Sequence, residues 1–239
     1  MHRFRLFILL ALCLCPALAR GQEQTEASSP VEVGAELEFM NNYVWRGMAT
    51  GHPYAAGALA VSWRGLTLGT FALTGLAGGG EYQELDFSIA YTLGGLSFGL
   101  NDYWSSPTEV PYFHLRPRTT GHTLEAFVAY DFGPLSAAWY TNVAGSDLQE
   151  DGRRAWSSYF ELTSAEWSFL TCQWQAQLGI SPWASDYYGT RRFSVCEVGL
   201  SVSRDIVSTE DFSIPLVLRA SVNPTDRAFY FIFGFRFVI

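Results

Sequence analysis

A serine and three histidines are the first candidates for chemistry in this chain. Residues 95–99 (GLSFG) match the G-x-S-x-G pattern, in which a strained turn between a strand and a helix exposes the serine. Here the pattern runs from a Gly-Gly turn into a strand-like segment. After the N-terminal segment the histidines are His52, His114 and His122. They fall in predicted loops or strand ends on the side opposite Ser97, so we expect no Ser-His pair.

Carboxylates and arginines at alternating positions suggest a second kind of chemistry. In an extended chain every second side chain lies on the same face. The residues that share the polar face are Glu32, Glu36, Glu38, Glu84, Asp86, Glu125, Glu161 and Glu197, with Arg46, Arg219 and Arg236. Rings of Asp and Glu favour cations in a water-filled passage, whereas Arg is neutralised only by pairing. The set predicts either a weakly cation-selective pore or an interior plugged by charge pairs, and the two are weighed evenly.

Two cysteines remain after the N-terminal segment, Cys172 and Cys196. They fall in neighbouring predicted strands, on the same predicted lipid-facing side, and are roughly symmetric about the connecting loop. A cross-strand disulfide is one prediction, and two free thiols that pack as small hydrophobes are the alternative. Neither cysteine has metal-ligand spacing with a histidine, so we expect no metal site and no cofactor.

These side chains need a scaffold, and alternation of apolar residues predicts an all-β fold. In the last segment, residues 227–239, five phenylalanines and Ile239 share one face, as in a strand that faces lipid. The same pattern predicts twelve strands, at 31–46, 54–63, 66–74, 82–93, 96–104, 122–131, 135–143, 155–163, 167–180, 192–203, 212–222 and 227–239. We therefore predict a transmembrane antiparallel up-and-down β-barrel.

The connections between these segments alternate in length, which is an independent sign of such a barrel. Short turns are predicted at 64–65, 94–95, 132–134 and 163–166, with 204–211 as a longer member, and the intervening loops include 75–81, 105–121, 144–154 and 181–191. Short periplasmic turns and long outer loops are typical of outer-membrane barrels. A soluble β-sandwich explains the alternation of side chains equally well. The membrane is favoured by two aromatic girdles, Trp63, Tyr91, Tyr130 and Trp167 near the inner turns and Trp45, Trp104, Trp139 and Trp156 near the outer loops.

The N-terminal residues predict export. Residues 1–19 combine Arg3 and Arg5, a short apolar core and an Ala-Leu-Ala cleavage site, which is the pattern of a signal peptide. Residues 20–30 are polar and predicted to be a flexible periplasmic leader, and residues 31–239 suit one barrel domain in the bacterial outer membrane. Removal of the signal leaves 13 basic against 23 acidic residues, a net charge of −10, so nothing suggests a nucleic-acid partner.

The segment Leu37 to Met48 (LEFMNNYVWRGM) resembles the opening strand of the TorF-like porin family, in which a polar pair is followed by Tyr-Val-aromatic-Arg-Gly. Residues 84–87 (ELDF) and 101–104 (NDYW) are also similar to that family. The resemblance implies an outer-membrane barrel with a porin function and supplies no catalytic residues. We predict from parity that Arg46 points into the lumen near the outer mouth, pairs with a carboxylate and helps to set the constriction. The alternative is that Arg46 and Gly47 only shape the first outer loop.

Three functions are consistent with the sequence. The favoured one is a porin for small hydrophilic solutes or ions, with outer-membrane lipid and the outer-membrane assembly machinery as partners. The second is a plugged structural or adhesion barrel. The third is a lipid-modifying enzyme that uses His122 and Asp102 as an acid-base dyad at the outer rim, and we expect that the protein is not an enzyme. The loop 105–121, with three prolines, either dips inward as a constriction or stands out from the barrel.

Overall fold

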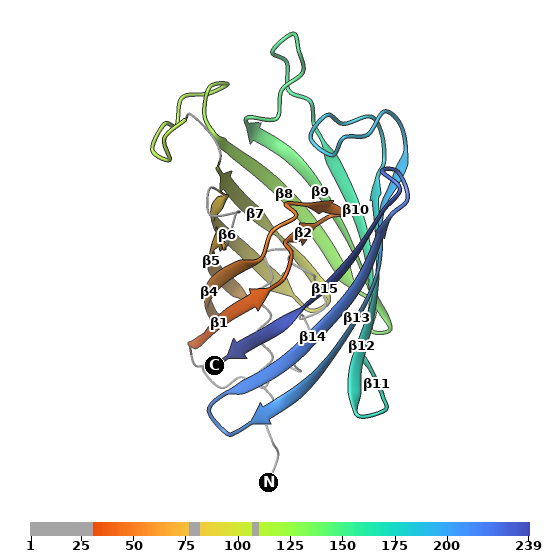
Figure 1. Ribbon diagram of the computed structural model, residues 1–239. Coiled ribbons are helices and arrows are strands. Elements are labelled where there is room, and N and C mark those ends of the chain that lie inside the picture. Colours follow the sequence, from red (N-terminus) through yellow and green to blue (C-terminus); the bar gives the residue numbers. More distant parts are fainter. Residues whose placement is uncertain (1–30, 77–81, 107–109) are drawn as a thin grey trace.

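The chain folds into a closed antiparallel β-barrel (Figure 1). The computed structural model describes residues 31–76, 82–106 and 110–239, so the predicted signal peptide and leader lie outside the described residues. The wall strands are β1 (Glu32–Met40), β4 (Tyr54–Trp63), β5 (Leu66–Gly75), β6 (Gln83–Leu93), β7 (Leu96–Ser105), β8 (His122–Asp131), β9 (Leu135–Gly145), β10 (Ser158–Ser164), β11 (Trp167–Phe169), β12 (Cys172–Ser181), β13 (Ser194–Ser208), β14 (Ser213–Asn223) and β15 (Ala228–Val238). Pairing of β1 with β15 closes the sheet.

The barrel has the twelve strands that the sequence predicts. β10 and β11 both pair with β12, because they are two parts of one strand that is interrupted near residues 165–166. Each remaining wall strand pairs with its neighbours in sequence order. Among the described residues, no helix is long and apolar enough to cross a membrane.

The outer surface of the barrel is apolar, which removes the soluble sandwich as an alternative. On β15, Phe229, Phe231, Phe233 and Phe235 are 64%, 53%, 50% and 46% exposed, whereas Ile232 between them is buried inside. The strand alternation therefore turns large hydrophobic side chains outward all around the barrel. Such a surface is stable in lipid and not in water.

One predicted turn is wrong, and backbone geometry gives the reason. The turn expected at 163–166 lies instead at Leu170 and Thr171, which both have positive φ (51° and 63°). Two consecutive positive φ values define the tight turn that suits the twist of a hairpin. The sequence Leu-Thr contains none of the Gly, Asn or Asp residues that are usual in such a turn, so the sequence pattern does not predict it. At the other inner turns, Arg64-Gly65 and Gly94-Gly95, the glycine signal located the turn correctly.

The first predicted strand is also shorter than expected. β1 ends at Met40, and Asn41 bonds to β15 through its side chain, with Nδ2 donating to the Phe231 carbonyl at 3.0 Å and Oδ1 accepting from the Phe233 N–H at 2.8 Å. The chain then forms a separate two-stranded hairpin, β2 (Val44–Trp45) and β3 (Met48–Ala49). Figure 1 shows this hairpin within the outline of the barrel rather than along its wall.

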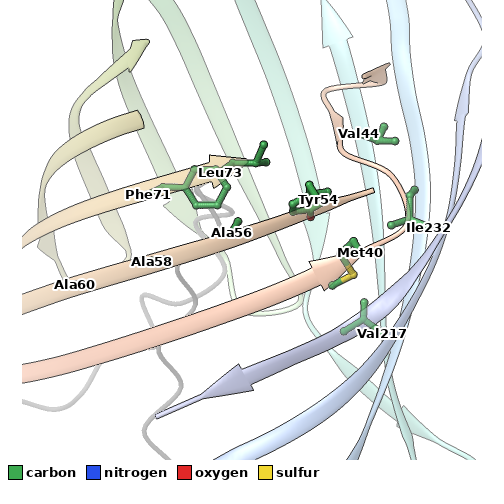
Figure 2. Packing of buried hydrophobic residues seen from close by; sticks show 10 residues of the cluster. All are labelled: Met40, Val44, Tyr54, Ala56, Ala58, Ala60, Phe71, Leu73, Val217 and Ile232. Atoms are coloured by element: carbon green, nitrogen blue, oxygen red, sulfur yellow. The ribbon is translucent and has the colours of Figure 1, made fainter. Parts of the chain in front are cut away.

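The interior is not polar throughout. An apolar cluster lines one side of it and draws on β1, β4, β5, β14, β15 and the hairpin (Figure 2). Its members are Met40, Val44, Tyr54, Ala56, Ala58, Ala60, Phe71, Leu73, Val217 and Ile232. Val44 of the hairpin packs into this cluster, so the hairpin is held to the wall by buried apolar surface. Three of the members are alanines, which keep this wall thin.

Candidate functional site in the barrel interior

The hairpin β2–β3 carries Arg46 and Gly47 at its tip and contacts the barrel wall at β13 and β14. The Gly47 carbonyl accepts a hydrogen bond of 3.1 Å from Asn223 Nδ2, at the end of β14. A Cβ on Gly47 would lie 2.0 Å from the Cys196 carbonyl oxygen, and the residue has a φ of +77°. Only glycine combines this close approach with a positive φ at low cost. The tip is therefore docked against the wall and not merely near it.

Arg46 continues across the lumen to β8. Its Nη1 donates to Glu125 Oε2 at 2.5 Å and its Nη2 donates to Oε1 at 3.1 Å, which is the two-point geometry that suits a guanidinium and a carboxylate. The side chains are 3% and 0% exposed. β8 lies on the opposite side of the barrel from β1 in the strand order. The predicted pairing of Arg46 with an interior carboxylate is thus present, and Glu125 is the partner.

Aromatic rings surround this guanidinium. Its Cζ lies 4.6 Å from the ring centre of Trp45, 4.2 Å from Tyr140 and 4.8 Å from Tyr159, and Nη1 donates to the Tyr188 hydroxyl at 2.6 Å. Burial lowers the pKa of Arg46, but Glu125, Tyr188 and Tyr103 outweigh it, so the pKa stays well above its ordinary value. Arg46 is therefore a permanent cation in an aromatic cage.

Glu125 is fully hydrogen-bonded. Besides Arg46, its Oε1 accepts from Tyr103 Oη at 2.9 Å and from Asn101 Nδ2 at 3.2 Å. A buried carboxylate with several donors is stable in a way that an isolated one is not. Sequence parity already places Asn101, Tyr103 and Tyr159 on the polar face, so this part of the site was within reach of prediction. Tyr188 was not, because it lies on the long loop after β12.

A second charge cluster lies on β10, β12, β13 and β14. Arg219 Nη2 donates to Glu197 Oε1 and, at 2.9 Å, to Gln177 Oε1. The Ser221 hydroxyl donates to Glu197 at 2.8 Å, and Gln177 Nε2 donates to Glu161 at 2.6 Å. One arginine and one glutamine therefore hold both carboxylates of this wall.

A third cluster joins the first and last wall strands. Arg236 on β15 contacts Glu36 at 3.3 Å and Glu38 at 3.2 Å on β1, and Tyr54 Oη donates to Glu38 at 2.7 Å. Glu38 faces Arg236 directly across the β1–β15 pairing. These ion pairs lie on the seam that closes the barrel, where they stabilise the pairing as cross-strand pairs of opposite charge.

Glu84 and Asp86 on β6 differ from the other predicted interior carboxylates. Glu84 accepts from Tyr43 Oη at 3.2 Å and Tyr82 Oη at 2.7 Å, and Asp86 Oδ1 accepts from the Trp104 N–H at 3.3 Å. Within the described ranges, neither forms a salt bridge. The structure thus places the predicted interior residues on the inner side of the barrel. The three arginines pair with Glu36, Glu38, Glu125 and Glu197, whereas no salt bridge within the described ranges involves Glu32, Glu84, Asp86 or Glu161.

The cysteines do not meet, which corrects the predicted cross-strand disulfide. Both Cys172 and Cys196 are free. Cys172 begins β12, whereas Cys196 lies beside Gly179 and Ile180 at its other end, where the register shifts by a bulge. A β-bulge adds a residue to one strand, so Cys196 and Glu197 are both buried inside the barrel. The prediction that Cys196 faces lipid is therefore wrong as well.

Trp45 is a second correction, because it was assigned to the outer aromatic girdle. It instead lies in the hairpin and contacts Tyr103, Tyr187 and Tyr188, with ring centres 5.7, 6.1 and 6.1 Å away. The inner girdle residues behave as predicted: Trp63, Tyr91, Tyr130 and Trp167 are each 40–49% exposed on the outer surface.

The rim histidine does meet its predicted partner. His122 Nδ1 lies 2.9 Å from Asp102 Oδ2, and its Nε2 lies 2.6 Å from the Tyr112 carbonyl oxygen. Both ring nitrogens are thus occupied by acceptors, and neither is directed at a nucleophile. Ser97 bonds instead to Thr92, with 2.9 Å between hydroxyls. The pair ties the loop after β7 to the rim, and the described part of that loop, residues 110–121, stands out from the barrel (Figure 1).

Comparisons with known proteins agree with this architecture. No protein-family model matches the chain, and no curated protein does. Among solved structures, KdgM porin aligns over 85% of this chain and 98% of its own, with a TM-score of 0.50 and 7% identity. KdgM porin in complex with disordered oligogalacturonate aligns with a TM-score of 0.49, 7% identity and coverage of 86% and 97%. An outer-membrane channel from Pseudomonas putida covers 91% of this chain and 99% of its own, with a TM-score of 0.43 and 12% identity.

The fold and the comparison define a class. The chain is a twelve-strand antiparallel β-barrel with an apolar outer surface, and KdgM porin has a similar fold. At 7% identity the likeness to KdgM porin shows this fold and nothing finer.

Proposed function

We propose that this protein is a porin-like channel of the bacterial outer membrane for small hydrophilic solutes or ions, with the hairpin β2–β3 as its constriction. The observation that carries the proposal is the position of Arg46, which crosses the interior from the hairpin to Glu125 on β8. A loop that folds into a barrel narrows the passage without blocking it completely. Membership of the TorF-like porins is part of the same proposal, and it rests on residues 37–48.

The charges of the interior support a preference for cations. Eight of the predicted interior residues are carboxylates and three are arginines. Because each arginine is engaged by a carboxylate, the excess charge along the passage is negative. Negative rings attract cations and repel anions at close range. We therefore propose weak cation selectivity.

A plugged structural or adhesion barrel is the second candidate, and one observation favours it. Arg46, Glu125 and Glu197 are at most 3% exposed, and each is held by several polar contacts. Burial of this kind removes the charges from any passing solute. The hypothesis of a plugged barrel predicts a stable, correctly inserted protein that carries no current.

An experiment on the refolded protein separates the two. Single-channel conductance is recorded in planar bilayers, and the reversal potential is taken across a salt gradient. Steady openings with a cation-selective reversal potential support the channel. Silent bilayers, with heat-modifiable gel migration showing that the barrel is folded and vesicle flotation showing that it inserts, refute it and favour the plug. Openings with an anion-selective reversal potential refute the cation preference alone.

A further inference from the structure

A cavity of about 280 Å³ lies between the hairpin and the outer ends of β6 and β7. This volume is close to the lower limit of ligand sites, which span roughly 300–1,000 Å³. Five of the lining residues are aromatic, one is acidic and none is basic; they are Tyr43, Trp45, Met48, Ala49, Thr50, Tyr82, Glu84, Tyr103, Ser105 and Tyr187. The composition is that of a cage for a small cation.

The acidic residues at this cavity have no basic partner among the described residues. Glu84 lines it, and Asp86 lies two residues further along the same face of β6. Asp86 is 0% exposed, and its side chain hydrogen-bonds to that of Glu84, so the two carboxyl groups share a proton and carry one negative charge between them. No basic side chain in the described ranges forms a salt bridge with either residue, whereas arginines pair with Glu36, Glu38, Glu125 and Glu197, and Gln177 binds Glu161. Buried charge without a counter-charge is costly, so this site gains by admitting a cation.

The hydroxyls of Tyr43 and Tyr82 hold the Glu84 carboxylate in place by hydrogen bonds. Tyr43 and Tyr82 both donate to Glu84, one to each oxygen. Burial and the nearby Glu84 carboxylate raise the pKa of the Tyr82 phenol, which therefore remains a proton donor. With their hydroxyls committed to Glu84, the tyrosines offer ring faces rather than free donors to a guest. Such faces suit a weakly hydrated organic cation better than a compact, strongly hydrated metal ion.

The neighbouring Arg46 site shows the same chemistry with its cation in place. Arg46 is held by Glu125 and by the rings of Trp45, Tyr140 and Tyr159. Trp45 belongs to both places, since it also lines the cavity and contacts Tyr103 and Tyr187 there. The protein therefore contains one aromatic and acidic cage that is filled by its own guanidinium. Beside it lies a second cage that no basic side chain of the described residues lines.

We propose that this cavity is a binding subsite for a small organic cation of the substituted-ammonium class, with Glu84 as the counter-charge and Trp45, Tyr43, Tyr82, Tyr103 and Tyr187 as the walls. The inference rests on the proposed function, since it names the class of solute that a channel of this kind would collect at its outer mouth. Binding and conduction are nevertheless separate properties, and each is measured without the other.

Isothermal titration of the refolded, detergent-solubilised protein tests the subsite. Choline is the probe, and its neutral carbon isostere, dimethylbutanol, is the matched control because it has the same shape without the charge. We expect saturable choline binding that is at least about tenfold tighter than that of the isostere, since the carboxylate and the rings both act on charge. Glu84→Gln should weaken choline binding by about tenfold or more. Glu150→Gln, which alters an exposed loop carboxylate, should leave it unchanged.

Several outcomes would overturn the inference. Equal binding of choline and its isostere would show an apolar pocket, and tighter binding of a neutral sugar such as glucose would show a carbohydrate site. Choline binding that survives both Glu84→Gln and Tyr82→Leu in folded protein would place the site elsewhere. No choline binding to folded wild-type protein refutes the subsite outright. Choline binding by a silent barrel would keep the subsite and reject the channel, whereas current without binding would do the reverse.

Discussion

Replacement of Arg46 by alanine tests whether the hairpin β2–β3 constricts the passage or has no effect on conduction. The change removes both hydrogen bonds to Glu125, at 2.5 and 3.1 Å, and the contacts with three aromatic rings. Removing one partner of a buried ion pair costs about 3–5 kcal/mol. Glu125 keeps Asn101 and Tyr103 as donors, so we take the lower value, about 3 kcal/mol. This corresponds to a shift of roughly 150-fold toward the undocked hairpin.

The substitution also changes the charge that a passing ion meets. Loss of the guanidinium leaves Glu125 without its cation, which makes the constriction more negative by one charge. A unit charge at about 4 Å in water is worth about 1 kcal/mol, or about fivefold in local cation concentration. Arg46→Ala should therefore raise the single-channel conductance and move the reversal potential further toward that of cations.

Two controls make the result specific. Arg153→Ala removes an arginine that is 79% exposed and pairs with Asp151 in an outer loop, so it should change neither quantity. The double variant Arg46→Ala/Glu125→Gln restores the wild-type charge and should return the reversal potential toward its original value while the conductance stays high. If folded Arg46→Ala matches Arg153→Ala in conductance and reversal potential, the hairpin is no constriction and the reasoning fails.

Three further predictions follow from the geometry. Gly47→Ala should undock the hairpin and raise the conductance, because the new Cβ would lie 2.0 Å from the Cys196 carbonyl oxygen. Gly51→Ala is the matched control, since Gly51 has a similar φ of +78° and a Cβ there would have nothing within 4 Å. An equal effect of the two substitutions would refute the contact. His122→Ala should release the loop after β7 by removing its bonds to Asp102 and Tyr112, each worth about 1–3 kcal/mol. Trypsin should then cut faster after Arg118, which is followed by Thr119, while the barrel stays intact, and unchanged cleavage would contradict this. Under denaturing conditions, a protein that consists of residues 20–239 should bind two equivalents of maleimide without prior reduction, since Cys172 and Cys196 are free. No binding before reduction and two equivalents after it would indicate a disulfide between them.

The wall of the barrel was predictable because each strand repeats one rule many times. Alternation assigns a whole strand at once, so Phe229 to Phe235 fix the outward face of β15 and Ile232 its inward face. The same parity located the interior carboxylates and arginines. The alternation rule fails at the bulge beside Cys196, where two consecutive residues point inward. The prediction of turns fails at Leu170 and Thr171, because neither residue type favours a turn.

The docking of the hairpin was beyond sequence reasoning for a different reason. Parity gave Arg46 an inward direction, but its partner on β8 depends on the curvature of the whole sheet, which brings residues 46 and 125 together across the lumen. Tyr188 comes from a loop with no period to read. Contacts between a loop and a distant wall are set by tertiary geometry, and no pattern within either segment encodes them.

The distribution of charge links the constriction to the cavity beside it. Deep in the barrel, arginines hold Glu125, Glu197 and Glu36 in place, so these carboxylates attract a passing cation only weakly. At the outer mouth, Glu84 and Asp86 have no such partner in the described chain. Conduction requires sites that bind well enough to admit an ion and weakly enough to release it. A strong outer site followed by weaker inner ones meets that requirement for solutes entering from outside, and Glu84→Gln should therefore lower the cation current at low solute concentration more than at saturation.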